Sequence, residues 1–115
     1  MRRIFLYIGG MVLNIVIKSP LTFYKFISLV GIDLTRKEKE LLVLLYEANK
    51  DGLTTESRNE AFSLSSYSSK PVMNNVIKSI RDKGWIVNKV EFNGIVKSFD
   101  PGIKSVNFKF QKNEA

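Results

Sequence analysis

Amide and cationic side chains recur along one side of a predicted helix over residues 70–83. On a helical wheel, one side carries the apolar residues expected to be buried, Val72, Met73, Val76, Ile77 and Ile80. The other side carries the polar set Lys70, Asn74, Asn75, Lys78 and Arg81. Asparagine pairs bidentately with adenine in the major groove of DNA, arginine and lysine pair with guanine, and all three contact phosphates. The polar side of this helix is therefore a candidate surface for reading duplex DNA.

The residues next to this helix extend the candidate surface. Ser69 is expected to cap the helix, because a serine hydroxyl accepts a hydrogen bond from the first turn, where Pro71 is tolerated. Ser68 and Ser69 are also short donors suited to a phosphate at a helix N-terminus. The alternative is a simply solvated face, but such faces usually mix glutamate with lysine and arginine. Because Asp82 is the only acid here, we favour contact with DNA.

Two further helices are expected ahead of this one. Thr35 and Glu38 form a capping-box pattern immediately before a leucine-rich run, and Asp51-Gly52 ends that helix. A second helix is expected to begin at Thr54 or Thr55 and to continue to Phe62, with acidic residues in its first turn. The serine-rich segment 63–69 then makes a poor helix interior and a good turn. The order is therefore helix, helix, turn, helix.

After Gly84 the pattern changes to short strands. Asn93-Gly94 lies between two strand-forming runs, which predicts a hairpin over 86–99, because both central residues of a tight hairpin turn need a positive φ. Residues 106–110 alternate apolar and polar side chains, which predicts a half-buried closing strand. Lysines are expected to decorate these strands at Lys89, Lys97, Lys104 and Lys109.

Residues 1–32 are predicted to form an apolar strand followed by an aromatic helix. The run Ile4–Ile17 is shorter than the ~20 residues that a membrane-spanning helix needs, and no cleavage site follows it. Its β-branched residues instead favour a strand over 13–17, with Met11 as an alternative start that leaves 1–10 as a loose extension. The helix is expected to begin at Ser19-Pro20 and to end at Gly31. Its apolar face comprises Leu21, Phe23, Tyr24, Phe26, Ile27 and Val30.

The composition of the chain excludes several kinds of catalytic and metal site, and its charge favours one kind of partner. The chain of 115 residues has a net charge of +7 and contains neither cysteine nor histidine, which excludes disulfides, Cys/His zinc sites and histidine-based catalysis. Residues 1–32 carry +4, residues 33–60 carry −2 and residues 61–115 carry +5. Two basic ends around a near-neutral middle favour a polyanionic partner. The absence of cysteine fits a reducing compartment, so we expect a cytoplasmic protein.

The sequence does not predict an enzyme. It contains neither a Gly-x-Gly-x-x-Gly pattern nor a Gly-Lys-Ser/Thr phosphate loop, and none of its serines precedes a lysine by three residues. Glu38, Glu40, Glu47 and Glu56 are the candidates for a metal-binding carboxylate pair, but they lie among helix-cap and surface signals. We therefore expect no catalysis, no cofactor, no metal and no small-molecule substrate.

The sequence resembles winged helix-turn-helix proteins, and is similar in particular to short winged-helix proteins encoded by tailed bacteriophages. The matching stretches are LTRKEKELLVLLYEA, LTTESRNEAF, the serine-rich turn, VMNNVIKSIRDKGWIV and the basic hairpin, within about residues 12–110. The resemblance implies an α+β fold, with a strand–helix extension over 1–32 and a winged-helix domain over 33–112. It implies that helix 70–83 lies in the major groove, while Lys89 and Lys97 of the wing contact the backbone.

These observations predict a small transcriptional regulator of the phage type that binds duplex DNA in a sequence-specific manner in the host cytoplasm. A dimer is expected to form through the apolar segment 4–30, because paired half-sites raise affinity. The alternative is a winged-helix protein-interaction module, for example a component of a phage particle or replication complex, because fold does not dictate function. A third hypothesis, a membrane anchor over 1–17, is disfavoured by length.

Overall fold

A computed structural model describes residues 2–8, 11–17, 21–102 and 106–112, with side chains described over 21–102. Both helices and strands are present, so the predicted α+β class is confirmed. The chain divides into two compact units. Unit 1 comprises Met1–Val30 and Ser98–Ala115, and unit 2 comprises Gly31–Lys97. The strand at 106–112 thus groups with the N-terminal segment, whereas the sequence placed it with the domain 33–112.

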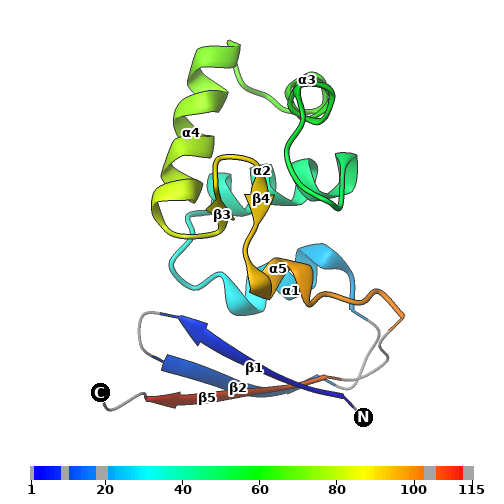
Figure 1. The fold of residues 1–115 in the computed structure, drawn as a ribbon, viewed down its shortest axis with the longest axis vertical. Helices are drawn as coiled ribbons and strands as arrows, with labels where there is room; N and C mark the ends of the chain where they lie inside the picture. Colours follow the sequence, from blue (N-terminus) through cyan, green and yellow to red (C-terminus); the bar gives the residue numbers. More distant parts are fainter. Residues whose placement is uncertain (1, 9–10, 18–20, 103–105, 113–115) are drawn as a thin grey trace. The chain divides into compact units, whose positions relative to one another are not determined.

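Unit 1 contains three strands that pair with one another (Figure 1). These are β1 (Arg2–Ile8), β2 (Met11–Ile17) and β5 (Val106–Lys112). β2 runs antiparallel to β5 along its length, and β1 pairs antiparallel with β2 and parallel with β5. The strands expected at 13–17 and 106–110 are confirmed. Residues 2–8 are not a loose extension, because their backbone joins this sheet.

The aromatic helix of unit 1, α1, spans Phe23–Val30 and begins later than predicted. The Thr22 hydroxyl accepts a hydrogen bond from the Lys25 amide at 3.3 Å, so Thr22 occupies the position expected for Ser19. Ser19 and Pro20 lie outside the described residues. The helix ends before Gly31 as predicted.

The apolar face of α1 is buried, with one exception. Phe23, Phe26, Ile27 and Val30 are buried, and the Phe99 ring lies 5.3 Å from Phe23 and 5.1 Å from Phe26. Tyr24 was expected on the same face but is 49% exposed. Among the helices that the structure describes, none combines the length and the apolar character that crossing a bilayer requires.

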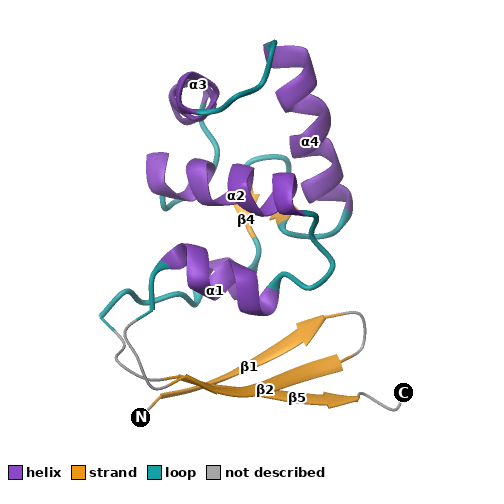
Figure 2. Cartoon of the chain, turned by 180° about the vertical axis from the view of Figure 1, so that it is seen from behind, coloured by secondary structure: helices purple, strands orange, loops and turns teal. Residues whose placement is uncertain are grey.

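Unit 2 is built on three helices, α2 (Arg36–Ala48), α3 (Thr55–Leu64) and α4 (Lys70–Asp82). α3 and α4 both lie beside α2 (Figure 2). The predicted capping box at α2 is confirmed, because Thr35 Oγ1 accepts from the Glu38 amide at 3.2 Å and the Glu38 carboxylate accepts from the Thr35 amide at 2.7 Å. Thr54 and Ser57 form a second capping box at α3. Local hydrogen bonds therefore fix both helix starts.

The core of unit 2 consists of aliphatic and aromatic side chains from these helices and from the segment after α4. Its largest fully buried members are Leu41, Leu42, Leu45, Met73, Ile80, Trp85, Ile86 and Phe92. The predicted buried side of helix 70–83 is correct for Met73, Ile77 and Ile80. Val76 is only half-buried, and Val72 is 43% exposed. Val72 lies in the first turn of α4, at the edge of the apolar stripe.

The hairpin of unit 2 turns at a different place from the one predicted. Its strands are β3 (Ile86–Val87) and β4 (Glu91–Phe92), and the turn residues Asn88 and Lys89 have φ values of 50° and 67°. Two consecutive positive φ values are the signature of a type I′ hairpin turn. The sequence assigned this role to Asn93-Gly94, and that prediction is wrong.

Asn93 instead begins a short helix, α5 (Gly94–Lys97). Its side-chain oxygen accepts from the Val96 amide at 3.0 Å, and its side-chain nitrogen donates to the Gly84 carbonyl at 3.1 Å. These two hydrogen bonds tie the start of α5 to the end of α4, which a hairpin turn at Asn93 would not do. The predicted hairpin 86–99 therefore ends at Phe92.

The segment between α2 and α3 approaches the hairpin closely at Gly52. The Leu53 amide donates to the Val90 carbonyl at 2.7 Å, and a Cβ at Gly52, whose φ is +147°, would lie 2.3 Å from that carbonyl oxygen.

We expect Gly52→Ala to lower the free energy of unfolding by about 2 kcal/mol or more, because the substitution strains the backbone and the new Cβ clashes with the Val90 carbonyl. Urea denaturation measures this change. Gly94→Ala is the control, because a Cβ there meets no atom within 4 Å. Equal midpoints for the two variants would contradict the prediction.

Candidate nucleic-acid interface

The N-terminus of α4 is fixed by Ser69, as predicted. Ser69 has an extended backbone, and its hydroxyl accepts a hydrogen bond from the Val72 amide at 3.4 Å. Pro71 occupies the first turn, where its missing amide hydrogen is tolerated. Ser68 precedes the cap and is exposed. The serine-rich turn therefore ends in a defined helix start, with Ser68 and Ser69 beside the first turn of α4.

The predicted polar side of α4 faces solvent. Lys70, Asn74, Asn75 and Lys78 are exposed and Arg81 is half-buried, while Met73, Ile77 and Ile80 on the other side are buried. Pro71 and Asp82 are also exposed. The structure thus brings the five residues expected to contact DNA onto one accessible side of a single helix. We call Lys70, Asn74, Asn75, Lys78 and Arg81 the polar face of α4.

Two cations of the polar face have defined surroundings. The Lys70 ammonium donates to the Asn59 side-chain oxygen at 2.9 Å, which links the start of α4 to α3. Arg81 lies in the last turn of α4, where a positive charge is favourable beside the negative end of the helix dipole. Asp82 follows Arg81 directly and is the single acid within α4. The local charge of α4 is therefore positive.

The two lysines assigned to the wing separate in the structure. Lys89 occupies the exposed hairpin turn, and its carbonyl oxygen accepts from the Arg58 guanidinium at 3.4 Å. Lys97 lies on α5 and not on the hairpin, with its ammonium 3.9 Å from the Glu91 carboxylate. Arg58 was not among the predicted residues, and it is a further cation beside the turn. The sequence carried no signal for this contact, because it joins residues far apart in the chain.

The C-terminal half of α4 is held by a buried carboxylate, Glu38, which the sequence indicated as a helix cap and as a candidate metal ligand but not as a partner of α4. Glu38 is 3% exposed, and its carboxylate accepts from the Ser79 hydroxyl at 2.5 Å and from the Lys83 ammonium at 2.7 Å. Burial raises the pKa of Glu38, but the hydrogen bonds from Lys83, Ser79 and Thr35 outweigh burial and lower that pKa to about 2. The start of α2 is therefore fixed to the end of α4.

The segment after α4 is attached to the same region. The Trp85 indole nitrogen donates to the Asp33 carboxylate at 3.1 and 3.2 Å, and the Lys83 ammonium donates to the Asp33 carbonyl at 2.8 Å. These contacts and the Glu38 network hold α4 in one orientation relative to α2. The polar face of α4 is therefore carried by a helix whose position is fixed at its C-terminal end.

The described residues contain no group of three or more acidic side chains placed to hold a metal ion, and the chain lacks histidine and cysteine. Comparison with known proteins gives no further identification, because no family model, curated protein or solved structure matches the chain. The chemical character of the surface is therefore the basis for assigning a function.

Proposed function

We propose that unit 2 is a winged helix-turn-helix domain that binds duplex DNA as a small regulator. α2, α3 and α4 form the three-helix core, and the β3–β4 hairpin is a short wing. The observation that carries this proposal is the polar face of α4, which is exposed while the opposite side of the helix is buried. Cations and amides on an accessible helix fit the donor and acceptor pattern of the major groove.

The residues of this surface take different roles. Among the five residues of the polar face, Asn75 and Lys78 lie furthest from the buried side of α4, so they are the candidates for base-edge contacts, with the exposed Asp82 between them. Lys70, Ser68 and Ser69 lie at the N-terminus of α4, where a phosphate is favourable. Lys89 and its neighbour Arg58 are placed to contact the backbone beside the groove.

Selection of bound duplexes from a random pool, followed by titration of the enriched sequence at several salt concentrations, tests the proposal. We expect an enriched motif and an affinity that falls by about 100-fold between 50 and 200 mM salt for about four phosphate contacts, because binding releases counterions. A pool without enrichment, or an affinity independent of salt, would contradict sequence-specific binding.

A second candidate function is a protein-interaction module in a particle or replication complex. The observation that favours it is the charge balance of unit 2, where residues 31–97 contain eleven basic and nine acidic residues. Such a module is expected to form stable assemblies and to show no affinity for duplex DNA. Light scattering beside the DNA titration separates the two functions. The same measurement tests the homodimer expected through segment 4–30. The α1 side chains Phe23, Phe26 and Ile27 are buried within a single copy, so they offer no exposed apolar surface for that contact.

A further inference from the structure

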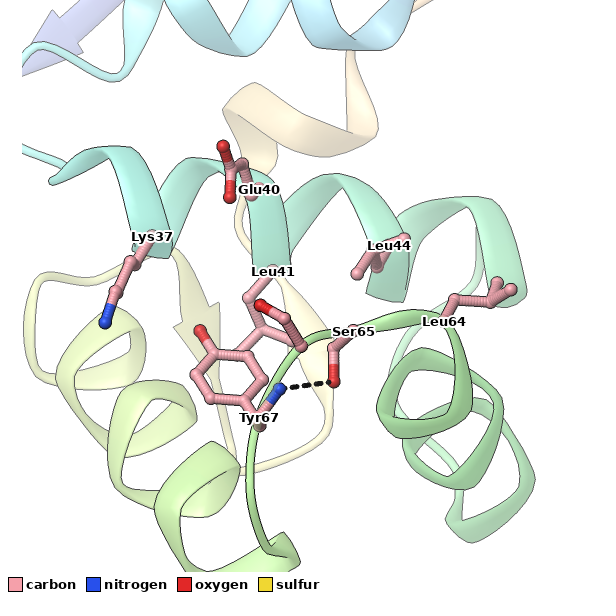
Figure 3. A pocket seen from close by; sticks show the side chains of 8 residues that line it. Lys37, Glu40, Leu41, Leu44, Leu64, Ser65 and Tyr67 are labelled. Atoms are coloured by element: carbon pink, nitrogen blue, oxygen red, sulfur yellow. Dashed lines mark hydrogen bonds between the residues drawn. The ribbon is translucent and has the colours of Figure 1, made fainter.

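A pocket lies in unit 2 between α2 and the turn that leads into α4. Its volume is about 280 Å³, and it is lined by residues of α2 and of segment 64–67: Lys37, Glu40, Leu41, Leu44, Leu64, Ser65, Ser66 and Tyr67 (Figure 3). Leu64 is 66% exposed beside it. The proposed contact with DNA uses the polar face of α4 and includes none of these residues.

The pocket has a polar end and an apolar end. In Figure 3, the Tyr67 hydroxyl and the Lys37 ammonium lie on one side, whereas the Leu44 and Leu64 side chains lie on the other. Within residues 21–102, neither the Tyr67 hydroxyl nor the Lys37 ammonium has a hydrogen-bond or ion-pair partner. The pocket therefore offers two unused hydrogen-bond donors next to apolar surface.

Lys37 is the group of the pocket lining that favours an anionic ligand. The Glu40 carboxylate accepts a hydrogen bond from the Arg36 guanidinium at 3.1 Å, and this ion pair offsets the charge of Glu40. Lys37, the other charged residue that lines the pocket, has no ion pair with the described residues. Burial raises the pKa of the Tyr67 hydroxyl, as do the negative charges of Glu40 and Glu38, so this hydroxyl stays a protonated donor. The same two carboxylates repel an anion, and the Lys37 ammonium is the charge that offsets them. Both groups of the polar end thus match a hydrogen-bond acceptor with negative charge.

We propose that this pocket binds a small organic carboxylate, with the carboxylate at Lys37 and Tyr67 and its apolar body against Leu41, Leu44 and Leu64. The pocket is small enough that a single ring or a short chain fills it. The Tyr67 amide donates to the Ser65 hydroxyl at 3.4 Å, so the turn holds its own shape and presents the Tyr67 ring to α2. A bound carboxylate bridges α2 and the turn.

Titration of the full chain with phenylacetate, followed by amide chemical shifts, tests this proposal. We expect saturable shifts at Ser65, Ser66 and Tyr67 with a millimolar dissociation constant, as is usual for a ligand of about ten heavy atoms. Phenethylamine has the same shape but carries a positive charge, so it is expected to give no saturable shift. Shifts that do not saturate by 50 mM phenylacetate, or equal affinity for the amine, would overturn the proposal.

Variants locate the binding. Tyr67→Phe and Lys37→Met each remove one donor and are expected to weaken phenylacetate binding by about fivefold or more. Lys39→Met is the control, because Lys39 lies on the same helix but does not line the pocket. Unchanged affinity in both donor variants, or an equal loss in the control, would show that the carboxylate binds elsewhere.

Discussion

Replacement of Lys78 and Arg81 by glutamate is expected to abolish binding of duplex DNA. Both residues belong to the polar face of α4, and Lys78 is exposed. Each substitution removes a cation worth about 1–3 kcal/mol at the interface and adds a charge that repels phosphate, so we expect a loss of about 1,000-fold or more. Fluorescence anisotropy with the selected duplex at low salt measures this loss.

The matched control is the double variant Lys39→Glu and Lys50→Glu, which changes the net charge of the chain by the same amount at sites outside α4. It is expected to retain most of the affinity. Circular dichroism must show equal helix content in both variants, because Arg81 is half-buried. If the α4 variant binds the duplex with wild-type affinity, the proposed interface is refuted. If the control variant loses as much affinity as the α4 variant, binding depends on the net charge of the chain and not on the polar face of α4.

Glu38→Gln is expected to destabilise unit 2 by about 3 kcal/mol at neutral pH and to flatten its acid denaturation profile. The pKa of Glu38 is about 2 in the folded protein against 4.5 for an ordinary glutamate. As the pH falls, the unfolded chain binds the proton first, so the stabilisation present above pH ~5 is lost progressively toward pH ~2. The expected loss of about 3 kcal/mol follows from ~1.4 kcal/mol for each unit of difference between the folded and unfolded pKa values of Glu38. It agrees with the usual cost of removing one partner from a buried ion pair.

Urea denaturation at pH 7, 5 and 3 measures this contribution. The wild-type protein is expected to lose most of the Glu38 stabilisation between pH 5 and 3, whereas the variant is expected to change less. Glu40→Gln is the control, because Glu40 is exposed on the same helix. Parallel profiles for wild type and Glu38→Gln would show that this carboxylate does not control the acid sensitivity.

Structural features that depend on residues close together in the sequence were predictable. The capping box of Thr35 and Glu38 and the cap at Ser69 are patterns within four residues, and both occur in the structure. The polar and buried sides of α4 were also predictable, because they follow from helical periodicity. Val72 and Tyr24 were assigned to buried faces from the same periodicity. Both are exposed, because neighbouring elements decide how wide the buried stripe becomes.

Features that join distant residues were not predictable. The hydrogen bonds of Glu38 with Ser79 and Lys83 span more than forty residues, and the pocket beside Tyr67 exists only once α2 meets the turn. The hairpin turn was misplaced for a related reason. Asn93-Gly94 has the better local turn sequence, but the Asn93 side chain is used to cap α5 and to bind Gly84. Asn88-Lys89 turns the chain instead.

The pairing of β2 with β5 has a consequence for the order of folding. The two strands belong to segments on either side of unit 2 in the chain, so the sheet of unit 1 is complete only after both segments have been synthesised. Unit 2 is continuous in sequence and can acquire its structure while synthesis proceeds. We therefore expect unit 2 to fold before the sheet of unit 1 is complete.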